Sequence, residues 1–259
     1  MRIALGISYD GGQFHGWQKQ PNCRTVQGEL ERALSQVADS PIVIHAAGRT
    51  DTGVHATGQV IHFDCDNERS ARAWVYGTNS YLPHDITVGW AKYVDAEFHA
   101  RHTATARRYQ YYIYNHPIRP SLFVHHLTWH YRPLDVEAMH QAAQQLLGEK
   151  DFTSFRSIEC QSTSSKRSIY TFDIKRRGDL VILDITANAF LHHMVRNLAG
   201  TLMLIGSGKY HIDWIAEVLA AKNRCYAGET APAYGLYLVH VQYPAELALP
   251  NPPALPSYF

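Results

Sequence analysis

The alternation of apolar and polar residues starts at the N-terminus, where every second residue of the run 2–9 is apolar or aromatic. A period of two is typical of a half-buried strand, so we expect a strand there that ends at a pair of glycines. The same criteria predict seven further strands, at 59–65, 86–94, 107–114, 127–131, 169–174, 180–186 and 236–243. The sixth and seventh of the eight strands flank the Gly178-Asp179 pair, which predicts a hairpin.

Apolar residues recur at helical spacing after three residues that can cap a helix N-terminus, namely Thr25, Asp135 and Asp213. We therefore expect amphipathic helices after each of them. A short helix is expected near 70–76, and a long apolar helix over 190–205.

The elements follow one outline twice: strand, helix, strands, and again strand, helix, strands. Antiparallel strands with interspersed helices predict an α+β fold, in which two related halves share a continuous, mainly antiparallel sheet. We place the N-terminal half at 1–102 and the C-terminal half at 103–243. The tail 244–259 carries five prolines, and we expect it to pack little.

Composition narrows the class of protein. The chain has 259 residues, of which 46% are hydrophobic and 18% charged, as in a soluble globular protein. The N-terminus lacks the long apolar core of a signal peptide, and no run approaches the roughly 20 apolar residues of a membrane span. The four cysteines are far apart with no Cys-x-x-Cys pair, which argues against a zinc ribbon or a disulfide framework. We expect a cytoplasmic protein with reduced thiols and no membrane contact.

The net charge of +1 does not by itself indicate a nucleic-acid-binding protein. Local clusters are more informative, because phosphates and bases together require cations interleaved with aromatic rings. Arg101, Arg107 and Arg108 lie around a run of four tyrosines at 109–114, and further basic groups occur at 166–167 and 175–177. For any one cluster taken alone, a solvated surface is the favoured interpretation.

The stretch from Gly48 to His55 is the most unusual in the chain, because it places Asp51 between an arginine, two threonines, a histidine and two glycines. Asp beside Thr and Gly is typical of an ordinary turn. Arg49 and His55 also bracket the carboxylate with cations that favour its ionised form. The residues alone leave both interpretations of Asp51 open, a turn residue and a reactive carboxylate.

Other site chemistries find little support. Sixteen histidines suggest a metal, but no His-Glu-x-x-His or His-x-x-x-His pattern exists, and adjacent histidines in a helix diverge by about 100°. Asp51 has no evident acidic partner of the kind a glycosidase or aspartic protease needs. No phosphate loop or dinucleotide motif occurs either, since Gly206-Ser207-Gly208-Lys209 is only a fragment. A lone carboxylate with cations and aromatics fits chemistry on a nucleobase without redox or ATP.

Arg196 is the second unusual residue, because it is a charged side chain within an apolar segment. It interrupts the apolar helix expected over 190–205. Many helical arginines are simply exposed, and that interpretation stays open here. A cation among buried neighbours would require a carboxylate partner, for which Asp51 is the candidate.

Taken together, these motifs resemble the A family of tRNA pseudouridine synthases over nearly the whole chain. The matching stretches are Tyr9-Asp10-Gly11, Phe14-His15-Gly16-Trp17-Gln18, Thr25-Val26-Gln27, Gly48-Arg49-Thr50-Asp51-Thr52-Gly53-Val54-His55-Ala56, Phe98-His99-Ala100-Arg101, Arg108-Tyr109-Gln110-Tyr111, Asp151-Phe152-Thr153-Ser154-Phe155, Phe190-Leu191, Met194-Val195-Arg196-Asn197 and Thr230-Ala231-Pro232-Ala233. The proline-rich tail and the segment 158–168 depart from the family pattern.

The resemblance implies a pseudouridine synthase fold with a central RNA-binding cleft, and it implies roles for four residues. Asp51 attacks the uridine, at ribose C1′ or at base C6. Tyr109 stacks on the flipped base and takes part in proton transfer. Arg196 pairs with Asp51, and Arg49 intrudes on the RNA to hold the target base out of the stack.

The resemblance also implies a homodimer that modifies uridines 38 to 40 in the anticodon arm of tRNA, with no cofactor and no metal. We expect Arg101, Arg107 and Arg108 to bind the tRNA along with Arg49 and Tyr109. Two other functions are weighed against this one. A non-catalytic RNA-binding protein would not need Asp51, Tyr109 and Arg196 together, and a metal-dependent hydrolase would lose activity in EDTA.

Overall fold

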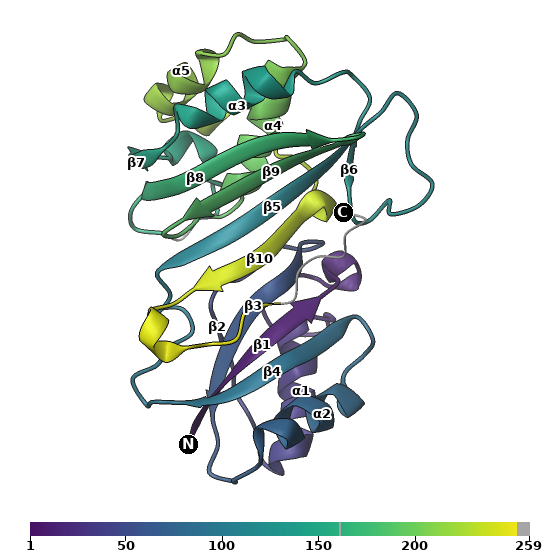
Figure 1. Ribbon diagram of the computed structural model, residues 1–259, viewed down its shortest axis with the longest axis vertical. Coiled ribbons are helices and arrows are strands. Elements are labelled where there is room, and N and C mark those ends of the chain that lie inside the picture. Colours follow the sequence, from purple (N-terminus) through teal and green to yellow (C-terminus); the bar gives the residue numbers. More distant parts are fainter. Residues whose placement is uncertain (161, 253–259) are drawn as a thin grey trace. The chain divides into compact units, whose positions relative to one another are not determined.

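The computed structural model describes residues 1–160 and 162–252 (Figure 1). Its contacts divide the chain into two compact units, each of which contains strands and helices, and the strands belong to one ten-stranded mixed sheet of the described chain. Unit 1 comprises 1–105 together with the chain from 237 onward, and unit 2 comprises 106–236.

The sheet of unit 1 has the strand order β4-β1-β3-β10, with the short strand β2 paired to β3. The strands are β1 (Arg2–Tyr9), β2 (His45–Ala46), β3 (His55–Asp64), β4 (Ile86–Val94) and β10 (Leu236–Gln242). β1 runs antiparallel to both β3 and β4, whereas β10 runs parallel to β3.

Two helices, α1 (Val26–Ala38) and α2 (Ala71–Tyr81), pack on one face of this sheet (Figure 1). Thr25 caps α1 as expected, its side chain accepting from the amide of Gly28 at 3.3 Å. The ring of Phe63 meets Trp74 edge-on with centroids 5.1 Å apart, so α2 and β3 share one apolar core.

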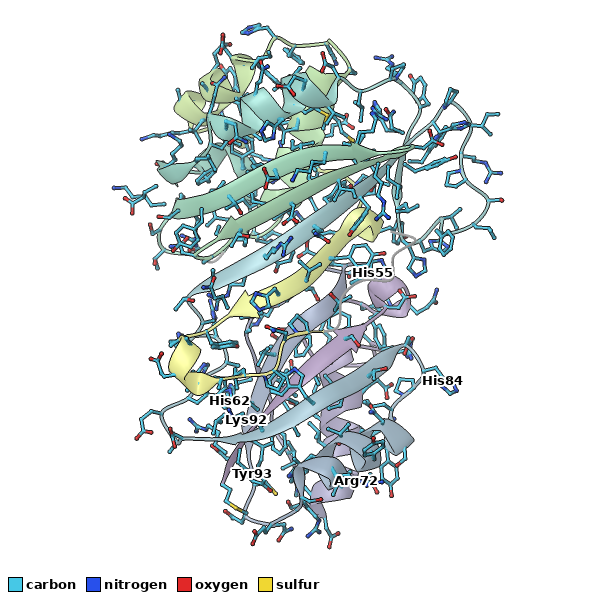
Figure 2. The ribbon with its side chains drawn as sticks, in the orientation of Figure 1. His55, His62, Arg72, His84, Lys92 and Tyr93 are labelled. Atoms are coloured by element: carbon cyan, nitrogen blue, oxygen red, sulfur yellow. The ribbon has the colours of Figure 1, made fainter. Side chains whose placement is uncertain are left out.

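The opposite face of the unit 1 sheet is crossed by the proline-rich tail. After β10 the chain forms a short turn of helix, and Nζ of Lys92 on β4 donates to the carbonyls of Leu247 at 2.7 Å and Ala248 at 2.9 Å (Figure 2). The expectation that this tail packs little is therefore wrong for residues 244–252. The rest of the predicted tail, 253–259, lies outside the described residues.

Unit 2 has the strand order β5-β9-β8-β7, with β6 paired parallel to β5. The strands are β5 (Ala106–Asn115), β6 (Thr128–His130), β7 (Gly148–Asp151), β8 (Lys166–Arg177) and β9 (Leu180–Ala187). β8 and β9 form the predicted hairpin, and Gly178 adopts a φ of +58° in its turn. β9 pairs antiparallel with β5 over the length of the tyrosine-rich strand.

Three helices belong to unit 2: α3 (Val136–Gln144), α4 (Met194–Gly206) and α5 (Trp214–Ala221). The helices α3 and α4 approach closely, since an added Cβ at Gly206 would lie 2.5 Å from Sδ of Met139. Five single turns of 3₁₀ helix complete the described chain: η1 (Gly11–Gln13), η2 (Thr153–Phe155), η3 (Arg224–Tyr226), η4 (Ala233–Gly235) and η5 (Ala245–Leu247).

The long helix expected over 190–205 is wrong at its start. α4 begins only at Met194, because His193 adopts a left-handed φ of 62° that ends the helical geometry. The rings of His192 and His193 consequently do not diverge as they would on a helix, and their centroids lie 4.0 Å apart.

The predicted α+β class is confirmed by these strands and helices. The two units differ from the predicted halves 1–102 and 103–243 mainly at the C-terminal end of the chain. β10, which the prediction places in the C-terminal half, pairs with β3 and belongs to unit 1, as do the described residues of the predicted separate tail. None of the helices in the described part of the chain is long and apolar enough to cross a lipid bilayer.

Candidate active-site residues

Asp51 lies in a tight turn that leads into β3. The amide of Val54 donates to the carbonyl of Asp51 at 3.1 Å, which closes the turn. Gly53 occupies the third position with a φ of +80°, the left-handed angle that a type II turn requires there. The turn interpretation is thus confirmed. It leaves the chemical interpretation open, because a turn can also present a reactive side chain.

The residue before Asp51 is held at two points. The hydroxyl of Tyr9 lies 2.8 Å from Oγ1 of Thr50, and both side chains are buried. The amide of Trp17 donates to the carbonyl of Thr50 at 3.0 Å. Gly16, with a φ of +78°, packs so closely that an added Cβ would lie 3.0 Å from the same carbonyl oxygen. Residues far from the turn in sequence therefore fix its approach.

Further contacts hold the two ends of the loop. Gln59 is fully buried and donates from Nε2 to the carbonyl of Gly48 at 2.7 Å. Gly11 lies against the other end, where an added Cβ would be 1.9 Å from the carbonyl oxygen of Val54. Arg49 is exposed, although the residues on either side of it are held.

His55, which we expected beside Asp51 as a cation, is almost completely buried. The amide of Gly11 donates to its Nδ1 at 3.1 Å, and a carboxylate oxygen of Asp10 lies 3.0 Å from the same atom. Its ring stacks on Tyr237 of β10 with centroids 4.6 Å apart. His55 therefore joins the start of β3 to η1 and to β10.

Tyr9 remains a neutral hydrogen-bonding group at physiological pH. Burial raises the pKa of its hydroxyl to about 12, and hydrogen bonding to the side chains of Thr50 and Gln59 opposes that rise. The contact with Thr50 is therefore one between two uncharged hydroxyls.

Arg101 lies in the loop after β4, where its side chain is exposed. Its amide donates to Nδ1 of His99 at 3.1 Å, and the neighbouring amide of Ala100 donates to Nδ1 of His62 at 3.1 Å. Two histidine rings thus shape the backbone that carries this predicted tRNA contact. The rings of His62 and His99 also touch each other, with centroids 4.6 Å apart.

In unit 2, Tyr109 lies on β5 opposite Ile185 of β9 and is 8% exposed. Its ring meets the ring of Phe190 at 82°, with centroids 5.0 Å apart. An edge-to-face aromatic neighbour of this kind restrains the plane of the tyrosine ring.

Arg107 and Arg108 lie on opposite faces of β5, because side chains alternate along a strand. Arg107 is on the same face as Tyr109, is nearly buried and donates to the carbonyl of Asn188 at 3.0 Å. Arg108 instead forms a two-pronged ion pair with Asp184, through contacts of 2.7 Å and 2.5 Å. The two arginines that we grouped as tRNA contacts therefore have different surroundings.

Arg196 is half-buried in the first turn of α4. Its Nε donates to the carbonyl of Ala231 at 2.8 Å, and the amide of Ala231 donates back to the carbonyl of Arg196 at 3.2 Å. Beside it, Oδ1 of Asn197 accepts from Arg224 at 3.0 Å and from Thr230 at 2.7 Å. The segment Thr230-Ala231-Pro232-Ala233 thus orients Arg196.

The same motif is tied to β5 by a second buried tyrosine. The hydroxyl of Tyr111 donates to the carbonyl of Pro232 at 2.8 Å and lies 2.6 Å from Oγ1 of Thr128. Burial raises the pKa of Tyr111 well above its usual value, opposed by the hydrogen bond with Thr128 and by the charge of Arg196. Tyr111 is accordingly a neutral donor, and it helps hold the chain that Arg196 contacts.

The predicted site residues are divided between the units. Asp51, Arg49 and Arg101 belong to unit 1, whereas unit 2 carries Tyr109, Arg107, Arg108 and Arg196. The roles of all seven stay predictions. Sequence reasoning missed the residues that support them, namely Tyr9, Gly16, Trp17, Gln59 and Tyr111. Four of these, all but Gln59, stood in the quoted family motifs without an assigned role.

Comparison with known proteins gives a consistent result. The family described as tRNA pseudouridine synthase matches residues 6–102 and 142–244. The tRNA pseudouridine synthase A of Legionella pneumophila strain Lens is 59% identical over 249 residues, which cover 96% of this chain and 95% of that protein. The protein of the same name from Aeromonas hydrophila is 56% identical over 258 residues, covering 100% of this chain and 96% of that protein.

Proposed function

Because the chain belongs to the tRNA pseudouridine synthase family, we propose that it isomerises uridine to pseudouridine at positions 38 to 40 of the anticodon stem-loop of tRNAs. The observation that carries the proposal is the Asp51 turn. It presents a carboxylate from a loop whose neighbouring residues are held by buried hydrogen bonds and close glycine contacts. Catalysis requires this kind of fixed placement of a reacting group.

The reaction begins with the uridine leaving the base stack, which costs a few kcal/mol. Stacking on an aromatic ring returns roughly 1–3 kcal/mol of that cost, and Tyr109 is the ring we propose for it. Arg49, exposed beside Asp51, enters the RNA and fills the space that the base leaves.

Asp51 then acts as the nucleophile, at C1′ of the ribose or at C6 of the base. In either route the N1–C1′ bond breaks, a C5–C1′ bond forms, and the bond to Asp51 is broken again. C5 loses its proton to water and N1 takes up a proton, so the product is an isomer of uridine. No electrons are gained or lost overall, so the chemistry needs no redox cofactor. Tyr109 assists the proton transfer, a contribution typically worth about 10²–10⁴-fold in rate.

Arg196 keeps Asp51 ionised by pairing with it. A carboxylate withdrawn from water is stabilised in its charged form by a nearby cation, and an unpaired one is not. The hydrogen bond from Nε of Arg196 to the carbonyl of Ala231 supports this role, because it restrains the guanidinium.

Arg101, Arg107 and Arg108 are proposed to bind tRNA phosphates, so binding should weaken steeply as salt rises. We further propose that the enzyme works in the cytoplasm as a homodimer, without metal or cofactor. Sedimentation of the purified protein tests the dimer, and activity that persists in excess EDTA tests the absence of a metal.

The test of the function is tritium release from tRNA labelled at uridine C5. We expect release from a tRNA with uridine at positions 38 to 40 and none when these three are replaced by cytidine. Asp51→Asn should remain folded and bind tRNA but release no tritium, since Asn keeps the turn while the nucleophile is gone. Asp39→Asn is the matched control, because Asp39 is exposed and has a left-handed φ of 53° that Asn tolerates.

Each alternative has its own outcome. A non-catalytic RNA-binding protein would bind the tRNA and release no tritium in any variant. A metal-dependent hydrolase would lose its activity in EDTA. If Asp51 were only a turn residue, Asp51→Asn would keep substantial activity, with mass spectrometry excluding deamidation back to Asp.

A further inference from the structure

Beneath the Asp51 turn lies a buried pair of hydroxyls, on Tyr9 and Thr50, that the proposed chemistry does not use. The two oxygens are 2.8 Å apart. Tyr9 is 5% exposed and Thr50 is 8% exposed, so water contributes little to satisfying either group. Tyr9 is the last residue of β1, where it pairs with Ala56 of β3 and Ile86 of β4. Its ring is therefore fixed between two strands.

The turn itself does not require this pair. It is closed by the hydrogen bond from Val54 to Asp51, and Gly53 supplies the left-handed angle. Two buried hydroxyls are also no more stabilising than apolar groups of the same shape, because their hydrogen bond only replaces bonds to water. What a hydrogen bond adds over an apolar contact is direction, since its strength depends on distance and angle.

The hydrogen bond with Tyr9 restrains Thr50, the residue next to Asp51. The side chain of Thr50 is held by Tyr9 and its carbonyl by the amide of Trp17, so Thr50 is restrained on two sides. Two residues earlier, the carbonyl of Gly48 is held by Gln59. The chain between these anchors has little freedom to move sideways, and the carboxylate of Asp51 is carried on a short side chain that inherits the position of its backbone.

We propose that Tyr9 is a positioning residue for Asp51, and that its hydroxyl sets the place of the carboxylate through Thr50. The inference rests on the proposed function, in which Asp51 is the nucleophile. It assigns Tyr9 no contact with the substrate. A displacement of a reacting group by about 1 Å costs on the order of 10²-fold in rate, so a small loss of restraint at Thr50 has a measurable effect.

The experiment compares Tyr9→Phe, Thr50→Val and the double variant. Tyr9→Phe removes the hydroxyl that both Thr50 and Gln59 contact, and Thr50→Val leaves the Tyr9 hydroxyl with Gln59 alone, so each should lower the melting temperature. The double variant places two apolar groups together and should recover the part of the loss that comes from the unpaired Thr50 hydroxyl. If Tyr9 positions Asp51, kcat of the double variant should stay about 10- to 100-fold below that of wild type, with KM for tRNA unchanged. The reason is that two apolar groups do not restore the directional restraint of the hydrogen bond.

Thr78→Val is the matched control for removing a buried hydroxyl. Thr78 lies fully buried on α2 in the same unit, and its hydroxyl has no hydrogen-bond partner among the residues that the structure describes. This variant should retain wild-type kcat. Amide hydrogen exchange gives a readout independent of activity: Val54, which closes the turn, should exchange faster in the double variant while the amides of β1 and β3 keep their protection.

A double variant that regains both melting temperature and kcat would overturn the inference, because the hydroxyl pair would then be purely structural. Unchanged exchange at Val54 would overturn it as well. Wild type and Asp51→Asn are assayed for tritium release alongside. If the wild type releases no tritium, or if Asp51→Asn is active, the proposed function itself is contradicted. If wild type and Asp51→Asn behave as expected and the double variant is fully active, only the role of Tyr9 is contradicted.

Discussion

The two units hold their candidate residues in different ways. In unit 1 the backbone around Asp51 is fixed, through the carbonyls of Gly48 and Thr50 and the close packing of Gly16. In unit 2 the side chain itself is held, as Arg196 is held through its Nε by the carbonyl of Ala231. The difference follows from side-chain length. The carboxylate of Asp is one carbon from the backbone, so fixing the backbone fixes the carboxylate, whereas the guanidinium of Arg lies on a long flexible side chain and has to be held by an acceptor of its own.

This contrast indicates which positions of each unit should be sensitive to substitution. Around Asp51 the sensitive positions are glycines and buried hydroxyls. In unit 2 they are the functional side chains themselves and the carbonyls they contact. The predictions below test the contrast from the largest expected effect to the smallest.

Tyr109→Phe should give the largest loss after removal of Asp51 itself. The ring is kept, with its edge-on contact to Phe190, so tRNA affinity should hold. Turnover should fall by about 10²–10⁴-fold if the hydroxyl moves a proton. Single-turnover tritium release, with tRNA binding measured separately, checks the split. If Tyr109→Phe and wild type have equal turnover, the hydroxyl has no role in proton transfer and the ring only stacks on the base.

Gly16→Ala should be the next most damaging change, although Gly16 carries no side chain at all. An added Cβ would meet the backbone of the Asp51 turn at 3.0 to 3.3 Å, so the turn must shift. These contacts require a shift of a few tenths of an ångström. Because a displacement of about 1 Å costs on the order of 10²-fold in rate, we expect a measurable loss in kcat that stays below that figure. Gly208→Ala is the matched control, because its φ of +72° imposes similar backbone strain while nothing lies within 4 Å of its Cβ position.

Both glycine variants should lose comparable stability, by about 1 kcal/mol or more, since a left-handed angle is unfavourable for alanine. Activity then separates them: Gly208→Ala should retain wild-type kcat once it is assayed well below its melting temperature. If the two variants lose activity equally, the effect comes from stability, and the contrast between a fixed backbone and a fixed side chain fails.

Local pattern was enough to predict much of the fold. The alternation in β1, the cap at Thr25 and the turn glycine of the β8–β9 hairpin all act over a few residues, and all three are found as expected. The start of α4 was missed because His193 adopts a left-handed angle that no periodicity reveals. The place of β10 was missed because parallel pairing with β3 joins distant parts of the chain.

The candidate site shows the same limit. Asp51 stood out because an unusual polar stretch lies between two apolar ones. Its supports did not, because Tyr9, Trp17 and Gln59 reach the loop from other segments of the chain. Arg107 and Arg108 looked equivalent as neighbours in sequence, and only the partner strand supplies the Asp184 that separates them.

That separation predicts a smaller, testable difference in tRNA binding. Arg107→Gln and Arg108→Gln remove the same charge, but Arg108 is already neutralised by Asp184 on the face opposite Tyr109. We expect Arg107→Gln to reduce the slope of log affinity against log salt by about 0.7–0.9, as loss of one phosphate contact does, and Arg108→Gln to change it less. Filter binding at several salt concentrations measures both slopes. Equal slopes for the two variants would contradict the assignment of faces.

The smallest predicted effect concerns pH and the stability of unit 1. Burial lowers the pKa of His62 to about 4, reinforced by the nearby His99, His45 and Arg2 and opposed by Asp64. The neutral ring is the form whose Nδ1 can accept from Ala100. Between pH 4 and its usual 6.5 the unfolded chain therefore binds more protons at this position than the folded one.

The contribution of His62 to stability is consequently complete above about pH 6.5 and is lost as the pH falls toward 4. His62→Asn keeps an acceptor on the same carbon as Nδ1 and removes the titration, so its melting temperature should fall less than that of wild type over this range. His84→Asn is the control, because His84 is an exposed histidine of the same unit (Figure 2). Differential scanning calorimetry from pH 7 to 4.5 compares the three curves. If the wild-type and His62→Asn curves run parallel, the proton that destabilises unit 1 binds elsewhere.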